Sequence, residues 1–206
     1  MGGVSLPSVA DVLEIQLRQS WLASRQVLGD LTEDEYLWEP ASPCWSVRRR
    51  ASSVRGWGSG EFVCEDAWPP PHPLPTTTIA WRVIHLAAWT DVYRQFAFGD
   101  TRPDLNDAEV PGDLSAGLAW LYDAQDAFIE AVAGLSESAA FERRPAHWGE
   151  SVPVVRLVTT MLTEHVHHIA EIGALRDLHR GHALSQPPPS PIRGPSWWTG
   201  TPTTDE

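Results

Sequence analysis

Five side chains of the kinds that bind metals fall within one short stretch of the sequence. Glu164, His165, His167, His168 and Glu171 occupy eight residues of a segment whose apolar residues recur at helical spacing. Residues four apart on a helix project from the same stripe, so Glu164 and His168 can face one cation together. Packing alone does not explain this density of ligands. The pattern predicts a divalent-metal site on the last long helix.

The other members of this cluster point in different directions on the same helix. At 100° per residue, Glu164 and His168 lie toward one edge of the apolar stripe, which suits a metal that stays open to substrate. His165 points to the middle of the stripe and is either an alternative ligand or a core histidine. His167 points to solvent. Glu171, one turn further on, either orients a ligand or is solvated.

A third ligand has to come from another element, and His85 is the best candidate. It lies in the middle of residues 78–99, a segment that is apolar almost all round, with Trp81 and Trp89 one turn away on either side. A basic side chain in that setting needs a polar partner, and a cation held by the last helix would supply one. A hydrogen bond from His85 to a carbonyl is the plainer alternative. Two His and one Glu suit Zn²⁺ with a vacant position, and Fe²⁺, Ni²⁺ or Mn²⁺ as well.

Four long helices are predicted to position these ligands. Helical periodicity is found in residues 11–29, 78–99, 113–134 and 151–181, where Ser151 is the expected N-cap of the last helix and Gly181 its stop. The period is absent from 41–75, where Gly and Pro are frequent, so a long crossover follows the first helix. The expected fold class is all-α, an antiparallel four-helix bundle over residues 1–184. The Pro-rich tail, 185–206, is irregular, either extended or disordered.

Composition and charge exclude several classes of function. Lys and Arg number 15 against 27 Asp and Glu, which gives a net charge of −12 with His neutral. Nucleic-acid binding depends on clustered Lys and Arg, so nucleic acid is not an expected partner. No apolar run approaches the roughly 18 residues that span a bilayer, and no signal segment is evident. We therefore expect a cytoplasmic protein without a membrane partner, whose two cysteines lack disulfide or metal-binding spacing.

Three segments together resemble the DinB-like superfamily, in its actinobacterial branch: CWSVRRR (44–50), TTIAWRVIHL (77–86) and HHIAEIGALRD (167–177). The resemblance implies an antiparallel four-helix bundle with a divalent metal, one ligand from the second long helix and two from the last. Many members have His-x-x-x-His in the last helix, where this chain has Glu164 four residues before His168. The mycothiol-dependent maleylpyruvate isomerase branch has the same His, Glu, His set. By this resemblance the ligands are His85, Glu164 and His168.

The resemblance also implies a chemistry. A divalent metal lowers the pKa of a bound thiol until it is a thiolate nucleophile at neutral pH. We expect an enzyme that uses a low-molecular-weight thiol of the mycothiol type, for S-transfer or thiol-assisted isomerisation. Its small-molecule electrophile would lie in a pocket of Trp81, Arg82, Trp89 and Tyr93. The alternatives are a metal-dependent hydrolase and a non-catalytic ligand-binding or dimerisation bundle, and a homodimer is compatible with each of these functions.

Overall fold

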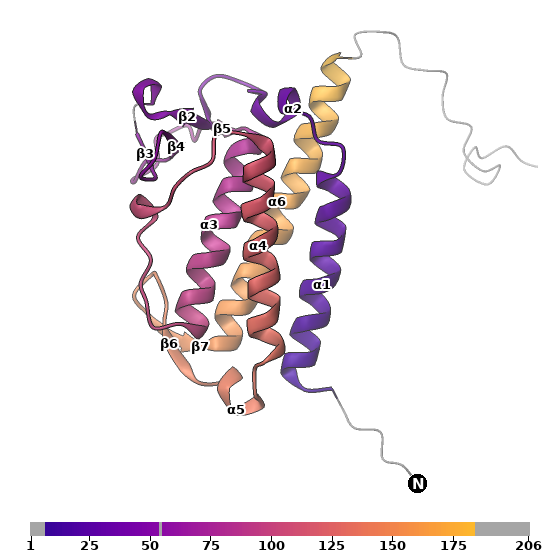
Figure 1. Cartoon of the computed structure of the whole chain (residues 1–206), viewed down its shortest axis with the longest axis vertical. Coiled ribbons are helices and arrows are strands. Elements are labelled where there is room, and N and C mark those ends of the chain that lie inside the picture. The colour runs from indigo at the N-terminus through magenta and orange to yellow at the C-terminus, as the bar shows by residue number, and fades with distance from the viewer. Residues whose placement is uncertain (1–6, 54, 184–206) are drawn as a thin grey trace, which may run out of the picture.

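The computed structural model describes residues 7–53 and 55–183, which form a bundle of four long helices (Figure 1). These helices are α1 (Val9–Leu28), α3 (Ile79–Phe98), α4 (Leu114–Ala133) and α6 (Val154–Ala183). Both α1 and α3 pack mainly against α4 and α6, so α1 and α3 occupy opposite corners of the bundle. The predicted all-α fold class is confirmed. The tail predicted for 185–206 lies outside the described residues.

Contacts at the two ends of the bundle fix the directions of the helices. Arg144, which follows α4, donates to the carbonyls of Phe96 and Gly99 at the end of α3, so α3 and α4 end together. At the other end Glu33, which follows α1, accepts from the amide of Leu114 at the start of α4. The α1–α4 and α3–α6 neighbours are therefore antiparallel, whereas α3 and α4 are parallel, which departs from the predicted antiparallel arrangement. A second crossover, between α3 and α4, returns the chain along the bundle (Figure 1).

Local sequence signals set most helix starts. Helix α1 and the short helix α2 (Glu33–Leu37) each begin with a capping box, in which the side chain of Ser8 or Thr32 accepts from the third helical amide. Thr78 and Asp113 cap α3 and α4 in the same way. These caps place the observed helices within two residues of the predicted starts.

The last helix differs from the prediction at both ends. Ser151 is not its N-cap, because Ser151–Pro153 forms strand β7, which pairs with β6 (Arg143–Pro145) in an antiparallel hairpin. Gly181 lies inside α6 rather than at its stop. The pairing of β6 with β7 joins residues six to ten positions apart, and the helical periodicity of α6 gives no sign of it.

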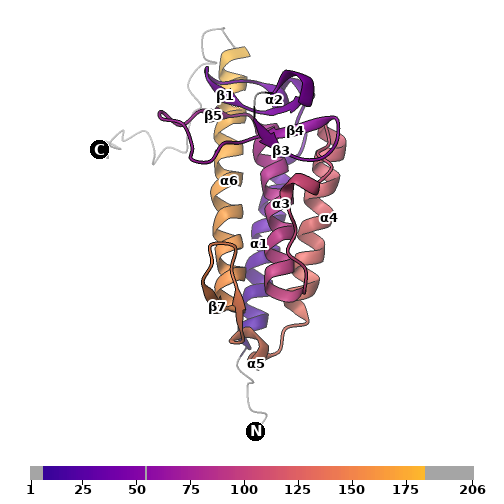
Figure 2. The ribbon, with the colours of Figure 1, turned by 90° about the vertical axis from the view of Figure 1, so that its left-hand side faces the viewer.

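Short strands and turns cover the two ends of the bundle (Figure 2). One end carries α2, the parallel pair β1–β5 and the three-stranded antiparallel sheet β2–β4–β3. The strands are β1 (Cys44–Trp45), β2 (Val47–Arg49), β3 (Gly56–Trp57), β4 (Phe62–Glu65) and β5 (Thr76–Thr77), with 3-10 turns η1 (Arg50–Ser52) and η2 (Leu105–Asp107) nearby. The other end carries α5 (Glu137–Ala140) and the β6–β7 hairpin. The predicted crossover after α1 is thus partly folded.

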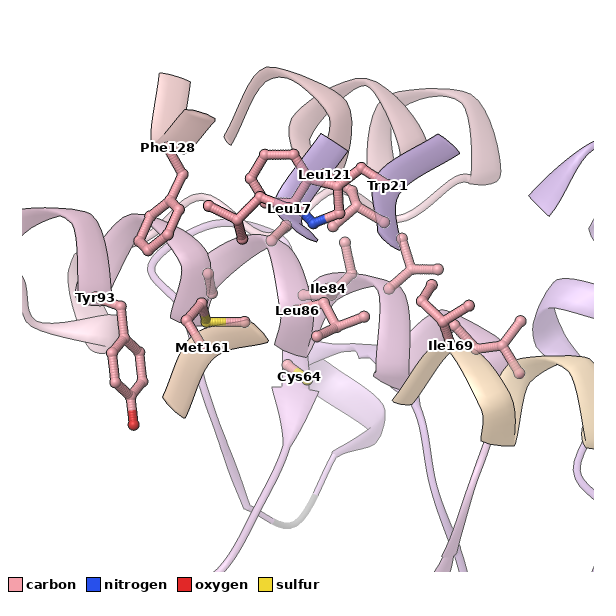
Figure 3. Packing of buried hydrophobic residues seen from close by; sticks show 14 of the residues in the cluster. Leu17, Trp21, Cys64, Ile84, Leu86, Tyr93, Leu121, Phe128, Met161 and Ile169 are labelled. Atoms are coloured by element: carbon pink, nitrogen blue, oxygen red, sulfur yellow. The ribbon is translucent and has the colours of Figure 1, made fainter. Parts of the chain in front are cut away.

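The core lies between the four helices (Figure 3). It gathers large apolar side chains from every helix of the bundle, among them Leu17, Trp21, Ile84, Leu86, Leu121, Phe128, Met161 and Ile169. Helix α3 is buried on several sides because α4, α6 and the small sheets all pack against it. Tyr93 of α3 points its hydroxyl away from this cluster in Figure 3, toward the side where the candidate site lies.

Candidate metal centre

His85, Glu164 and His168 come together between α3 and α6. One ligand atom from each of the three side chains lies within 4.8 Å of the other two. Nε2 of His168 is 3.6 Å from a carboxylate oxygen of Glu164, and the rings of His85 and His168 are 4.9 Å apart between centroids. The convergence that the sequence spacing predicted is therefore present in the geometry. Two nitrogens and one oxygen from two helices could hold one cation.

The described surroundings of His85 leave its imidazole nitrogens available to bind a metal. The ring stacks on Trp81, with 4.6 Å between centroids and an angle of 18° between planes, and Trp89 lies on the other side at 6.0 Å. Burial lowers the pKa of His85 to about 3, with His168 and Arg82 acting in the same direction, so the ring is neutral at neutral pH. Within the described ranges it makes no hydrogen bond to the protein. A neutral, half-buried imidazole whose nitrogens have no hydrogen-bond partner in the described ranges fits a metal ligand.

Two other side chains contact the Nδ1 side of the His168 ring. Its Nδ1 is 2.9 Å from a carboxylate oxygen of Glu171, and the guanidinium of Arg82 pairs with the same carboxylate. The guanidinium of Arg82 also lies 2.9 Å from this ring nitrogen, but a guanidinium only donates and this one is paired with Glu171, so we assign the proton to Nδ1, which donates it to the same carboxylate. This tautomer directs the lone pair of Nε2 toward Glu164 and His85. Burial, together with the positive charge of Arg82, lowers the pKa of His168. The carboxylate behind the ring is the usual support of a metal-bound histidine.

The other histidines of α6 lie elsewhere. His165 is buried in the bundle core, with Nδ1 3.3 Å from Nε2 of Gln125 and its ring against the edge of Trp21. His167 is exposed and lies 3.1 Å from Glu171. A second group, His167 with His168 and Glu171, also meets the distance criterion for an ion. We favour the group with His85, because Glu171 is already paired with Arg82, while the nitrogens of His85 have no hydrogen-bond partner among the residues that the structure describes.

A cavity of about 200 Å³ opens beside these side chains. It is lined by His85, Leu86, Trp89, Tyr93, His147, Met161 and Glu164. Trp89 and Tyr93 thus lie where the sequence predicted a substrate pocket. Trp81 and Arg82 do not line it, because Trp81 lies behind His85 and donates Nε1 to the carbonyl of Glu65, and Arg82 is paired with Glu171. A wider groove of about 480 Å³ between α1 and α6 carries no Asp, Glu, His or Cys among its lining residues.

Sequence reasoning missed one member of this cavity, His147. It belongs to the turn between β6 and β7, and the sequence around it, Pro145-Ala-His-Trp-Gly149, reads as a plain connector. The only local signal is an imidazole beside an indole at a glycine turn. Its place in the cavity depends on how the hairpin folds back on α3, which no spacing along the chain predicts.

The fold and the site define a class of helical proteins with a His and Glu cluster between bundle helices. A family model described as the DinB superfamily matches residues 16–172, so the chain belongs to the DinB superfamily. Members of that superfamily generally bind metals, and this chain has His and Glu groups placed to do so. No curated protein matched the sequence. No helix in the described part of the chain has the length and apolar character to cross a membrane.

Proposed function

We propose that the protein is a divalent-metal-dependent enzyme that uses a low-molecular-weight thiol of the mycothiol type. His85, Glu164 and His168 would hold the metal, with Zn²⁺ favoured and Ni²⁺, Fe²⁺ or Mn²⁺ as the other candidates. The observation that supports the proposal is the half-buried imidazole of His85, which has no hydrogen-bond partner in the described part of the chain and faces a histidine and a carboxylate from α6. When bound, such a metal lowers the pKa of a thiol so that it reacts as a thiolate.

Other side chains would orient the ligand His168 and bind the electrophile. Glu171 and Arg82 fix the ring of His168, and the aromatic cavity beside Glu164 receives the electrophile. At about 200 Å³, this cavity is smaller than the roughly 300–1,000 Å³ of pockets that enclose a drug-sized ligand. It accommodates a small electrophile and the reactive end of a thiol. The rest of a larger thiol would lie outside the cavity.

Hydrolysis by metal-bound water ranks second. A hydrolase needs a base near the water, and of the α6 residues considered in the sequence, Glu171 and His165 are available for that role. Glu171 is paired with Arg82, and His165 is bonded to Gln125 in the core, so neither faces the cavity. A non-catalytic binding or dimerisation bundle, including a homodimer, is the third alternative. Measuring the metal content of the purified protein distinguishes this alternative from the two enzymes.

Metal binding is tested first. Protein purified without added metal is subjected to elemental analysis and then titrated with Co²⁺, whose visible spectrum reports nitrogen and oxygen ligands. We expect one equivalent per chain. His85→Ala should weaken binding by more than the roughly 10–100-fold that loss of a supporting residue costs. His167→Ala, which alters an exposed histidine of the same helix, is the matched control and should leave affinity unchanged. Absence of stoichiometric metal would favour the non-catalytic alternative.

Thiol chemistry is tested next, with mycothiol and monobromobimane as the electrophile. The thiolate sulfur forms a bond to the bromide-bearing carbon, and bromide leaves with the bonding pair. We expect an adduct rate above the uncatalysed rate that EDTA abolishes and Zn²⁺ restores. Metal-bound protein that forms no adduct but cleaves a simple ester would instead support the hydrolase.

A further inference from the structure

The turn of the β6–β7 hairpin places His147 in the candidate cavity. Among the seven lining residues it alone comes from outside α3 and α6. Its ring centroid is 4.8 Å from that of Trp89 and 5.4 Å from that of Tyr93. The ring also meets Phe96 and Trp148 at its edges. His147 is an exposed residue, and its imidazole lies against these aromatic side chains on the wall of the cavity.

The backbone around His147 holds it in this position. Arg144 of β6 donates to carbonyls at the C-terminal end of α3, which ties the hairpin to the helix that carries His85. Within the turn, the amide of Ala146 donates to the carbonyl of Glu150 at 2.7 Å. Gly149 has φ +90°, a conformation that glycine adopts without strain. The position of His147 is therefore set by the ends of the bundle helices.

The nitrogens of His147 have no partner among residues 7–53 and 55–183. The neighbouring Trp148, by contrast, donates its indole N–H to Glu150 at 2.9 Å. Burial lowers the pKa of His147 from its ordinary value, although Glu164 acts in the opposite direction, so the ring is neutral at neutral pH. A neutral imidazole offers one donor and one acceptor. A polar group of this kind on a cavity wall can form a hydrogen bond with a ligand that enters the cavity.

The walls of the cavity restrict the ligand further. No Lys or Arg is among the lining residues, and the nearby Arg82 is neutralised by Glu171. An anionic group near His147 would have no cationic side chain among the lining residues to bind. A divalent metal would not supply the missing charge once a thiolate is bound, because Glu164 and the thiolate together neutralise it. Trp89 and Tyr93 favour a flat, conjugated group over a bulky saturated one. The cavity therefore selects for a small, flat and uncharged molecule.

We propose that His147 positions the electrophile, a small, flat, uncharged carbonyl compound, by donating a hydrogen bond to its carbonyl oxygen while Trp89 and Tyr93 enclose the conjugated part. This inference deepens the proposed function and rests on it, since the thiol would react at the His85 and Glu164 end of the same cavity. It favours S-transfer to a neutral acceptor over isomerisation of a substrate that carries carboxylates.

Binding of three probe molecules tests the recognition directly. Acetophenone is flat, neutral and has a carbonyl, cyclohexyl methyl ketone has the carbonyl without the flat ring, and benzoate is flat but anionic. Ligand-observed NMR titrations with the full chain, with Zn²⁺ and with EDTA, give the three dissociation constants. We expect acetophenone to bind several-fold more tightly than either of the others with EDTA present, where no metal is available to bind the carboxylate of benzoate. Tighter binding of benzoate with EDTA present would overturn the proposal.

Substitutions then assign the effect to His147. His147→Phe keeps an aromatic ring and removes the nitrogens, so acetophenone should bind about fivefold more weakly, the loss of one hydrogen bond. His147→Gln keeps a donor and should retain most of the affinity. His167→Phe, the same substitution at an exposed histidine outside the cavity lining, is the matched control and should bind as the unaltered chain does with EDTA present. Unchanged binding by His147→Phe would contradict the proposal.

The same measurements separate this inference from the proposed function. A protein that takes up no metal but ranks the probes as expected, with dependence on His147, would support the cavity assignment and refute the thiol enzyme. Metal-dependent adduct formation that is indifferent to His147→Phe, in KM as well as kcat, would support the enzyme and refute the role of His147.

Discussion

His165 and His168 of α6 have different roles because the helix directs their side chains toward different surroundings. His168 faces α3, where Glu171 and Arg82 hold its ring and leave one nitrogen toward His85. His165, three residues earlier, faces the bundle core and bonds Gln125. The sequence placed His165 nearest the middle of the apolar stripe, and its burial follows from that position. A histidine buried in the core contributes to stability in a way that depends on pH.

Acid should weaken the fold through His165. Burial lowers its pKa to about 4, below the ordinary 6.5, so the unfolded chain binds a proton that the folded chain does not as pH falls from about 6.5 to about 4. The contribution of His165 is therefore present above pH 6.5 and lost toward pH 4, by about 3 kcal/mol in all. Urea unfolding of metal-free protein at several pH values measures it. In His165→Gln, which keeps a polar partner for Gln125, this part of the pH dependence should vanish. An identical pH profile in the variant would contradict the assignment.

At the scale of elements, the sequence predicted the features that depend on residues close together in the chain, such as the helix starts. Helices α1, α3 and α4 were found within two residues of their expected starts, since Ser8, Thr78 and Asp113 supply caps beside periodic apolar runs. His85 and His168 were found because each is polar at a helical position that packing would fill with an apolar residue. The β6–β7 hairpin, and with it His147, was missed because its pairing and its docking on α3 depend on contacts distant in sequence.

Close packing between elements makes a matched pair of glycine substitutions informative. A Cβ at Gly117 of α4 would overlap the hydroxyl of Tyr36, which is fully buried, and would press on Ile84 of α3. Gly117→Ala should therefore lower the free energy of unfolding by about 1–3 kcal/mol. At Gly173 of α6 the nearest neighbour would be Val27 at 3.8 Å, an ordinary contact.

Gly173→Ala is the control for this pair. The same added methyl group should raise the free energy of unfolding by up to about 1 kcal/mol, because alanine loses less backbone entropy in a helix. Both values come from urea unfolding at constant pH, with the slope against denaturant checked for each variant. Equal effects of the two substitutions would mean that α4 and α2 are not in contact at Gly117 as described.

At the scale of the whole molecule, the candidate site joins two helices that the chain connects only through α4. His85 lies on α3, and Glu164 and His168 lie on α6, so the three meet only after the bundle has formed. A metal held there binds the folded state and not the unfolded chain. Its binding free energy therefore adds to the stability of the entire bundle.

Metal should consequently raise the melting temperature of the full chain. At a free concentration of about 100 times the dissociation constant, the added stability is about 2.7 kcal/mol, which corresponds to a rise of roughly 5–10 °C for a domain of this size. Thermal unfolding followed by circular dichroism, with Zn²⁺ and with EDTA, measures the shift. His85→Ala should abolish it, because the variant removes the only ligand that α3 contributes to the group. A shift that survives in His85→Ala but is lost in His167→Ala would place the ion on the solvent side of α6, at His167, His168 and Glu171, and the cross-helix centre would be wrong.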